Sequence, residues 1–187
     1  MPGINSRSKG ARNERLIADL FTKWTGRKFA KTPASGGLQW KSSFSKGDIV
    51  CTKEGHYFPF CIEAKSYAKI DFSHLLTPGI KNVDILTFWD QCSRDAKLCN
   101  KIPLLLMRYN GLPKGFYFLV TTQEYARSIH RFLPKDMKSL RYEDYSKPDC
   151  PPLMILRSTD FFKTNYKEIK AHAKSFIKKE IKDGNKK

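Results

Sequence analysis

Residues 46–66 read KGDIVCTKEGHYFPFCIEAKS, a stretch that places two acids and a lysine in segments that are otherwise apolar. The first acid, Asp48, follows a glycine, and Glu63 and Lys65 lie in the next apolar run. Because successive residues of a strand alternate between its faces, Glu63 and Lys65 are expected to point the same way. Buried charges are unfavourable unless they are paired, so these side chains need a partner, a metal ion or an exposed rim.

The apolar periodicity around this stretch predicts an α/β domain. A first helix is expected over residues 8–25, where Ile17, Phe21 and Trp24 recur at spacings of three and four. The other expected helices are 83–100, 123–132 and 161–182, and the expected strands are 27–31, 48–52, 57–67, 102–109, 115–121 and 153–156. This αβββαβ order, followed by β, α, β and α, predicts a mixed central β-sheet flanked by helices.

The composition indicates a polyanionic partner. The chain of 187 residues suits one domain, and its 35 Lys and Arg against 18 Asp and Glu give a net charge of +17. The basic residues concentrate towards both ends of the chain, and nucleic acid is the commonest partner of such a protein. A ribosome-associated or merely cationic surface is the alternative interpretation.

Other classes of protein are disfavoured by the sequence. The five cysteines include no CxxC pair, which is typical of reduced thiols rather than a disulfide framework or zinc site. The first twenty residues lack the apolar segment of a signal peptide, and no apolar run reaches membrane-spanning length. We therefore expect a soluble cytoplasmic protein with no membrane partner.

The acids and the lysine have the chemistry of a phosphodiester-cleaving centre. If residues 48–52 and 57–67 form neighbouring strands, Asp48 converges with Glu63 and Lys65, and two carboxylates suit Mg²⁺ or Mn²⁺. Such an ion acidifies water and stabilises charge on a phosphoryl oxygen, and a neighbouring lysine orients or deprotonates the attacking water. Glu14 lies on the apolar stripe of the first helix, so it could complete the ligand set.

These residues resemble the PD-(D/E)xK nuclease superfamily, through Gly47-Asp48, then Glu63-Ala64-Lys65, with Glu14 on the preceding helix. Over residues 8–110 the order of elements is most similar to archaeal-type Holliday junction resolvases and their viral relatives. The usual proline before the first acid is absent, and Lys46-Gly47 stands in its place. The resemblance implies a restriction-endonuclease-like core within residues 1–121 and a C-terminal extension, 122–187, packed on it and ending in a lysine-rich helix and tail.

The resemblance also implies a Mg²⁺- or Mn²⁺-dependent endonuclease acting on DNA. It assigns catalytic roles to Glu14, Asp48, Glu63, Lys65, Ser35 and Gln91. The three acids would be the metal ligands and the lysine the catalytic lysine. The serine corresponds to a loop residue near the scissile phosphate, and the glutamine to a helix residue that supports the site.

Basic residues that flank the proposed centre in sequence are expected to hold DNA through its phosphates. They are Arg7, Lys9, Arg12, Lys28 and Lys31. In its narrower form the prediction is a phage- or virus-encoded Holliday junction resolvase that cuts branched DNA as a symmetric homodimer. The rivals are a non-catalytic nucleic-acid-binding protein that retains the nuclease fold, and a restriction-type or RNA-cleaving enzyme.

Each site residue also has a purely structural interpretation. Glu63 and Lys65 could form an ion pair on an exposed sheet edge, and Glu14 could pair with Arg7, Arg15 or Lys23 on the surface of its own helix. Ser35 could belong to a simple turn beside two glycines. Gln91 could be a polar residue whose hydrogen bonds are satisfied within the fold.

Overall fold

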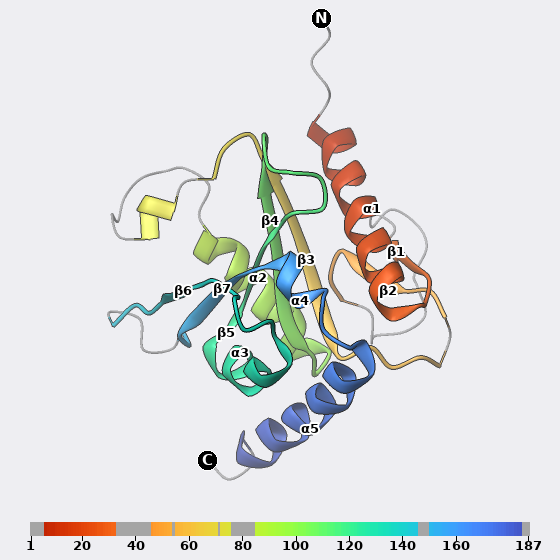
Figure 1. The fold of residues 1–187 in the computed structure, drawn as a ribbon, viewed down its shortest axis with the longest axis vertical. Helices are drawn as coiled ribbons and strands as arrows, with labels where there is room; N and C mark the ends of the chain where they lie inside the picture. Colours follow the sequence, from red (N-terminus) through yellow and green to blue (C-terminus); the bar gives the residue numbers. More distant parts are fainter. Residues whose placement is uncertain are drawn as a thin grey trace, which may run out of the picture.

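The protein folds around one seven-stranded sheet. The computed structural model describes residues 6–32, 46–53, 55–70, 72–75, 85–145 and 150–184. The strand order is β1-β2-β3-β4-β5-β7-β6, and β3 and β4 are parallel whereas all other neighbours are antiparallel. Helices cover both faces of this sheet (Figure 1), so the predicted α/β class with a mixed central sheet is confirmed.

The elements follow the predicted order with a few additions. The strands are β1 (Phe29–Lys31), β2 (Ile49–Cys51), β3 (Phe60–Tyr67), β4 (Ile102–Tyr109), β5 (Phe118–Thr122), β6 (Ser139–Tyr142) and β7 (Leu153–Arg157). The helices are α1 (Ser6–Thr25), α2 (Ile85–Leu98), α3 (Gln123–Ser128), α4 (Ser158–Phe161) and α5 (Tyr166–Gly184), with short 3₁₀ turns η1 (Phe72–Leu75) and η2 (His130–Phe132). None of the described helices combines the length and apolarity of a membrane span.

One face of the sheet packs against α1, α3 and α5. Ile17 and Phe21 of α1 are fully buried there against Ile62 of β3, which confirms the predicted apolar stripe of the first helix. Ile169 and Ala173 of α5 belong to the same core. The first helix and the last one therefore stabilise the same layer, although they come from opposite ends of the sequence.

The opposite face packs against α2. This helix buries Ile85, Trp89 and Cys92, which pack in one cluster with Leu105 and Met107 of β4. β4 is thus covered on both faces, as its continuous apolar sequence predicted. The helix α2 connects the parallel strands β3 and β4. It lies over the face of β3 that carries Glu63 and Lys65, because Lys65 donates a hydrogen bond to Gln91 of α2.

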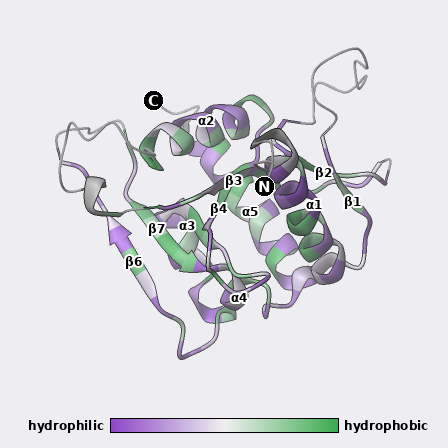
Figure 2. Ribbon diagram, turned by 90° about the horizontal axis from the view of Figure 1, so that it is seen from above, coloured by the Kyte–Doolittle hydropathy of each residue, from purple (hydrophilic) through white to green (hydrophobic). Residues whose placement is uncertain are grey.

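The sequence did not reveal β6. Its residues Ser139, Leu140 and Arg141 are exposed at the edge of the sheet, so the strand has no buried face to leave an alternating pattern. Figure 2 shows the contrast between hydrophilic β6 and its more hydrophobic neighbour β7. The predicted helix 161–182 is also divided, because the chain forms the short α4 before α5 starts at Tyr166.

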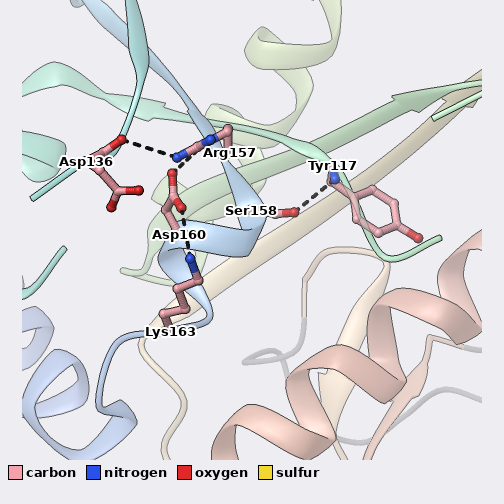
Figure 3. A network of polar contacts seen from close by, with 6 residues as sticks. All are labelled: Tyr117, Asp136, Arg157, Ser158, Asp160 and Lys163. Carbon is pink, nitrogen blue, oxygen red and sulfur yellow. Dashed lines mark hydrogen bonds and ion pairs between the residues drawn. The ribbon is translucent and has the colours of Figure 1, made fainter. Parts of the chain in front are cut away.

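Residues after 122 are joined to the sheet by buried polar contacts (Figure 3). Ser158 accepts a hydrogen bond from the Tyr117 amide at 2.9 Å, and its own amide donates to the Tyr117 carbonyl at 2.9 Å. The buried Asp160 carboxylate accepts from Arg157 Nε at 2.7 Å and lies 3.8 Å from Lys163 Nζ. The Ser158 bonds join α4 to the residue before β5, whereas the Asp160 contacts are local to residues 157–163. The division of the chain at residue 122 stays a prediction.

Replacing Asp160 by Ala should destabilise the protein by roughly 1.5–3 kcal/mol. The substitution removes a buried charged acceptor and leaves Arg157 and Lys163 without their carboxylate partner. The matched control is Glu143→Ala, which removes the more exposed pair with Arg141 and should change stability by less than about 1 kcal/mol. Urea denaturation measures both. Equal effects of the two substitutions would contradict a structural role for Asp160.

Candidate active site

Gly47 sets the position of the first acid. Its φ is +94°, and a Cβ at this residue would lie 2.7 Å from the Ile62 carbonyl oxygen of β3. The Asp48 amide donates a hydrogen bond to that same carbonyl at 2.7 Å. The Asp48 carbonyl in turn accepts a hydrogen bond from the Thr32 amide at 2.7 Å. A proline could not adopt this φ, which gives a physical reason for glycine where the PD-(D/E)xK motif usually has proline.

The Asp48 side chain turns towards β3. Its Oδ2 accepts a hydrogen bond from the Ala64 amide at 2.8 Å, so it is tied to the residue between Glu63 and Lys65. Burial raises the pKa of Asp48, and the Ala64 amide and the Lys65 ammonium only partly oppose that rise. The convergence expected of two neighbouring strands is therefore confirmed for these three side chains.

Glu63 and Lys65 lie on the same face of β3, as their spacing predicted. Lys65 Nζ is 2.6 Å from Glu63 Oε1 and donates a hydrogen bond to Gln91 Oε1 at 3.1 Å. An exposed sheet edge does not describe this pair, because Glu63 is only 2% exposed and β3 has strands on both sides. Glu63 Oε1 accepts no hydrogen bond of regular geometry from the described residues, so it is held by charge attraction.

The two charges affect each other's protonation. Burial, followed by the Asp48 carboxylate, raises the pKa of Glu63 to about 7, and Lys65 opposes this rise. Burial alone would lower the pKa of Lys65, but Glu63 and Asp48 outweigh it, and the pKa is raised. At neutral pH the lysine is therefore an ammonium ion, able to donate hydrogen bonds but not to accept a proton.

Glu14 approaches the site from α1. Burial and then Asp48 raise the pKa of Glu14, which shows that the two carboxylates are within electrostatic reach. Its ion-pair partner in the described residues is Lys31 of β1, at 3.8 Å. No ion pair joins Glu14 to Arg15 or Lys23, whereas a pair with Arg7 stays open because that side chain lies outside the described residues.

The carboxylates fit a divalent cation only in part. Glu14, Asp48 and Glu63 offer hard oxygen ligands whose raised pKa values a nearby cation would lower again. However, the described residues contain no group of three or more His, Cys, Asp and Glu side chains that is already close enough to hold a metal ion. The metal-ligand roles of Glu14, Asp48 and Glu63 stay a prediction, and water or substrate oxygens would have to complete such a site.

The structure leaves several predicted residues without a test. Ser35 lies outside the described residues, and so does the side chain of Arg7. Lys9 and Arg12 are on the first turns of α1, and Lys28 is exposed just before β1. Their contacts with phosphate stay a prediction.

Asp95 of α2 is a residue that the sequence analysis missed. Its charge contributes to the raised pKa values of both Asp48 and Glu63. It follows Gln91 by four residues, one helical turn, so the two share a face of α2. That spacing is a signal that could have identified it once Gln91 was placed near the lysine.

The αβββαβ core, with Asp48 beside Glu63 and Lys65, is the arrangement of a PD-(D/E)xK nuclease with a restriction-endonuclease-like fold. A family model described as "Phage putative PDDEXK endonuclease" matches residues 5–179. The chain belongs to this phage endonuclease family, and the match extends beyond the segment 8–110 in which the resemblance was first seen.

One relative gives a more detailed comparison. Protein D14 of Escherichia phage T5 is 32% identical over 107 residues, which cover 56% of this chain and 65% of that protein. No solved structure matches this chain significantly. The nuclease family is thus shown, whereas the closer likeness to Holliday junction resolvases stays a prediction.

Gly47→Ala should destabilise the protein by more than about 1 kcal/mol beyond Gly55→Ala. Both glycines have positive φ, but a Cβ at Gly55 meets no atom within 4 Å, whereas at Gly47 it collides with the backbone of β3. Thermal denaturation of the two variants separates the collision from the shared backbone strain. Equal melting temperatures would argue against close packing at Gly47.

Glu63→Gln should remove a pH-dependent contribution to the stability of the metal-free protein. In the folded protein the pKa of Glu63 is raised from 4.5 to about 7, so the folded state binds the proton more tightly than the unfolded chain. The stability of the wild type in EDTA should therefore rise as pH falls from about 7 towards 4.5. Melting temperatures across this range should show a flatter pH dependence for the variant, and an unchanged slope would contradict the raised pKa.

Proposed function

We propose that this protein is a metal-dependent endonuclease that hydrolyses phosphodiester bonds in DNA. The observation that carries the proposal is the buried ion pair between Glu63 and Lys65, with Asp48 hydrogen-bonded to the residue between them. A buried carboxylate with a raised pKa is unfavourable for stability, and such groups are concentrated in functional sites. Membership of an endonuclease family supports the same conclusion.

Lys65 has a defined role in this proposal. Because its pKa is raised, it stays protonated and supplies positive charge rather than acting as the general base. Gln91 Oε1 accepts a hydrogen bond from the ammonium group and so fixes its direction. Glu63 Oε1, 2.6 Å from the nitrogen, engages the ammonium as well, so one N–H would be left for a phosphoryl oxygen or the attacking water.

Asp48 and Glu63, with Glu14 near them, would hold the metal. A bound Mg²⁺ or Mn²⁺ supplies positive charge at the phosphoryl group and acidifies water at neutral pH. The hydrogen bond from the Ala64 amide keeps the Asp48 carboxylate oriented towards Glu63, so the two acids stay together despite their repulsion. DNA is favoured as the substrate by the net charge of +17, and Lys9, Arg12 and Lys28 are proposed phosphate contacts.

Asp48→Asn, Glu63→Gln and Lys65→Ala should each lower cleavage of DNA at least about 100-fold while leaving DNA binding largely intact. Lys167→Ala, an exposed lysine on α5, is the matched control for the loss of a charge and should cut as the wild type does. Cleavage is measured on a four-way junction, a flap, a linear duplex, single-stranded DNA and RNA, with Mg²⁺, Mn²⁺ or EDTA. Wild-type rates for the site variants would refute the proposed centre.

The same panel tests the narrower proposal of a Holliday junction resolvase. Preferred cutting of the four-way junction, together with a dimer in analytical ultracentrifugation, would support it. Equal cutting of all DNA forms would remove the resolvase assignment and leave a general nuclease, and preferred cutting of RNA would change the substrate class.

A non-catalytic nucleic-acid-binding protein is the second candidate. It is favoured by the lack of a ready three-ligand metal site among the described side chains. Calorimetry with Mn²⁺ distinguishes the two, because an endonuclease should bind the ion with an affinity that Asp48→Asn lowers. Saturable DNA binding without Mn²⁺ binding or cleavage would favour the second candidate.

A further inference from the structure

A basic pocket lies on the side of the sheet that α1 covers. It has a volume of about 440 Å³ and lies between the first turns of α1 and the connection from β4 to β5, elements that run side by side in Figure 1. Asn13 and Ser66 line it, and they are the chain neighbours of Glu14 and Lys65. Ser66 faces the α1 side of β3, whereas Glu63 and Lys65 face α2, so the pocket and the ion pair lie on opposite faces of the same strand.

Four cationic side chains line this pocket, and no acid does. They are Lys9, Arg12, Arg108 and Lys114. No ion pair joins any of them to a carboxylate within the described residues. Arg108 is held in place, since its Nη2 donates to the Leu112 carbonyl at 2.9 Å and its guanidinium lies over the Tyr117 ring. Such a concentration of like charge favours binding of an anion.

Asn13 adds an unused polar group to the pocket. The residue is 4% exposed, yet its Oδ1 accepts no hydrogen bond from the described part of the chain. A buried acceptor without a donor is unfavourable, so a ligand that supplies an N–H or O–H would relieve it. Leu16 and Leu112 provide apolar surface beside it.

Together these features suit a nucleotide better than an isolated phosphate ion. The cations match the phosphate, Asn13 matches an amino or hydroxyl group of the base or sugar, and the leucines match their apolar surface. The volume falls in the range of about 300–1,000 Å³ that is typical of small-molecule sites.

We propose that this pocket binds one unpaired nucleotide of the nucleic-acid substrate, with its phosphate against the four cations and its base or sugar against Asn13. The inference rests on the proposed nuclease function and narrows its substrate class. A paired base is stacked inside the duplex and cannot enter a pocket, so an end, a flap or another unpaired site is favoured over continuous duplex.

The test compares two DNAs in EDTA by fluorescence anisotropy, with a denaturing gel to show that they stay intact. One is a duplex closed by hairpins at both ends, and the other is the same duplex with a short single-stranded flap. The wild type should bind the flap DNA at least about tenfold more tightly. Asn13→Asp, which keeps the side-chain shape but adds a negative charge, should reduce this preference to less than about threefold.

Two lysine variants complete the experiment. Lys114→Gln should lower the affinity for the flap DNA more than that for the closed duplex, whereas the control Lys167→Gln should affect both DNAs equally. Lys114 is exposed in the β4–β5 connection, so this comparison holds even if Asn13→Asp prevents folding. Circular dichroism and melting curves check the folded state.

The outcomes separate this inference from the function on which it rests. Cleavage or binding of DNA with no preference for the flap, or with a preference that Lys114→Gln leaves unchanged, would overturn the pocket assignment alone. Failure to bind any nucleic acid would overturn both proposals. Loss of the preference in the pocket variants, with the control unchanged, is the result expected.

Discussion

The ion pair between Glu63 and Lys65 is the constraint on which the proposed site depends. Both charges lie on an interior strand, where a single unpaired charge would be strongly unfavourable. Each therefore requires the other, and their shared face of β3 requires α2 to supply Gln91. Asp48 is held beside this pair, because its carboxylate accepts a hydrogen bond from the amide of Ala64, the residue between Glu63 and Lys65.

This arrangement opposes stability in the metal-free state. Burial raises the pKa values of Glu14, Asp48 and Glu63, and a neighbouring carboxylate adds to each rise, Asp48 for the two glutamates and Asp95 for Asp48, so their ionised forms are less favourable in the folded protein than in the unfolded chain. A fold optimised for stability alone would not bury acids within electrostatic reach of one another. Their persistence is understandable if a cation and a phosphate occupy the site during the reaction.

The sheet brings distant segments to one end of β3. α1 contributes Glu14 and part of the basic pocket, β4 contributes Arg108, and the register pairs Arg108 with Ser66, next to the catalytic lysine of the proposal. In the proposals, the two tasks use opposite faces of β3, with cleavage at the carboxylates and selection of the nucleotide in the pocket on the α1 side. Residues after 122 stabilise this scaffold by extending the sheet and by adding α5 to the layer that holds α1.

The sequence by itself determined the class of fold, most of the elements and the common face of Glu63 and Lys65, because these depend on local periodicity. It could not reveal exposed β6, whose residues leave no alternating pattern, and the roles of Ser35 and the basic residues stay predictions. Only the tertiary structure decided that Glu14 pairs with Lys31 and that Gly47 takes a positive φ in close contact with the backbone of β3. The same is true of the position of Asn13 of α1 in the lining of a basic pocket. These features arise where segments far apart in the chain pack together, and no local pattern specifies such contacts.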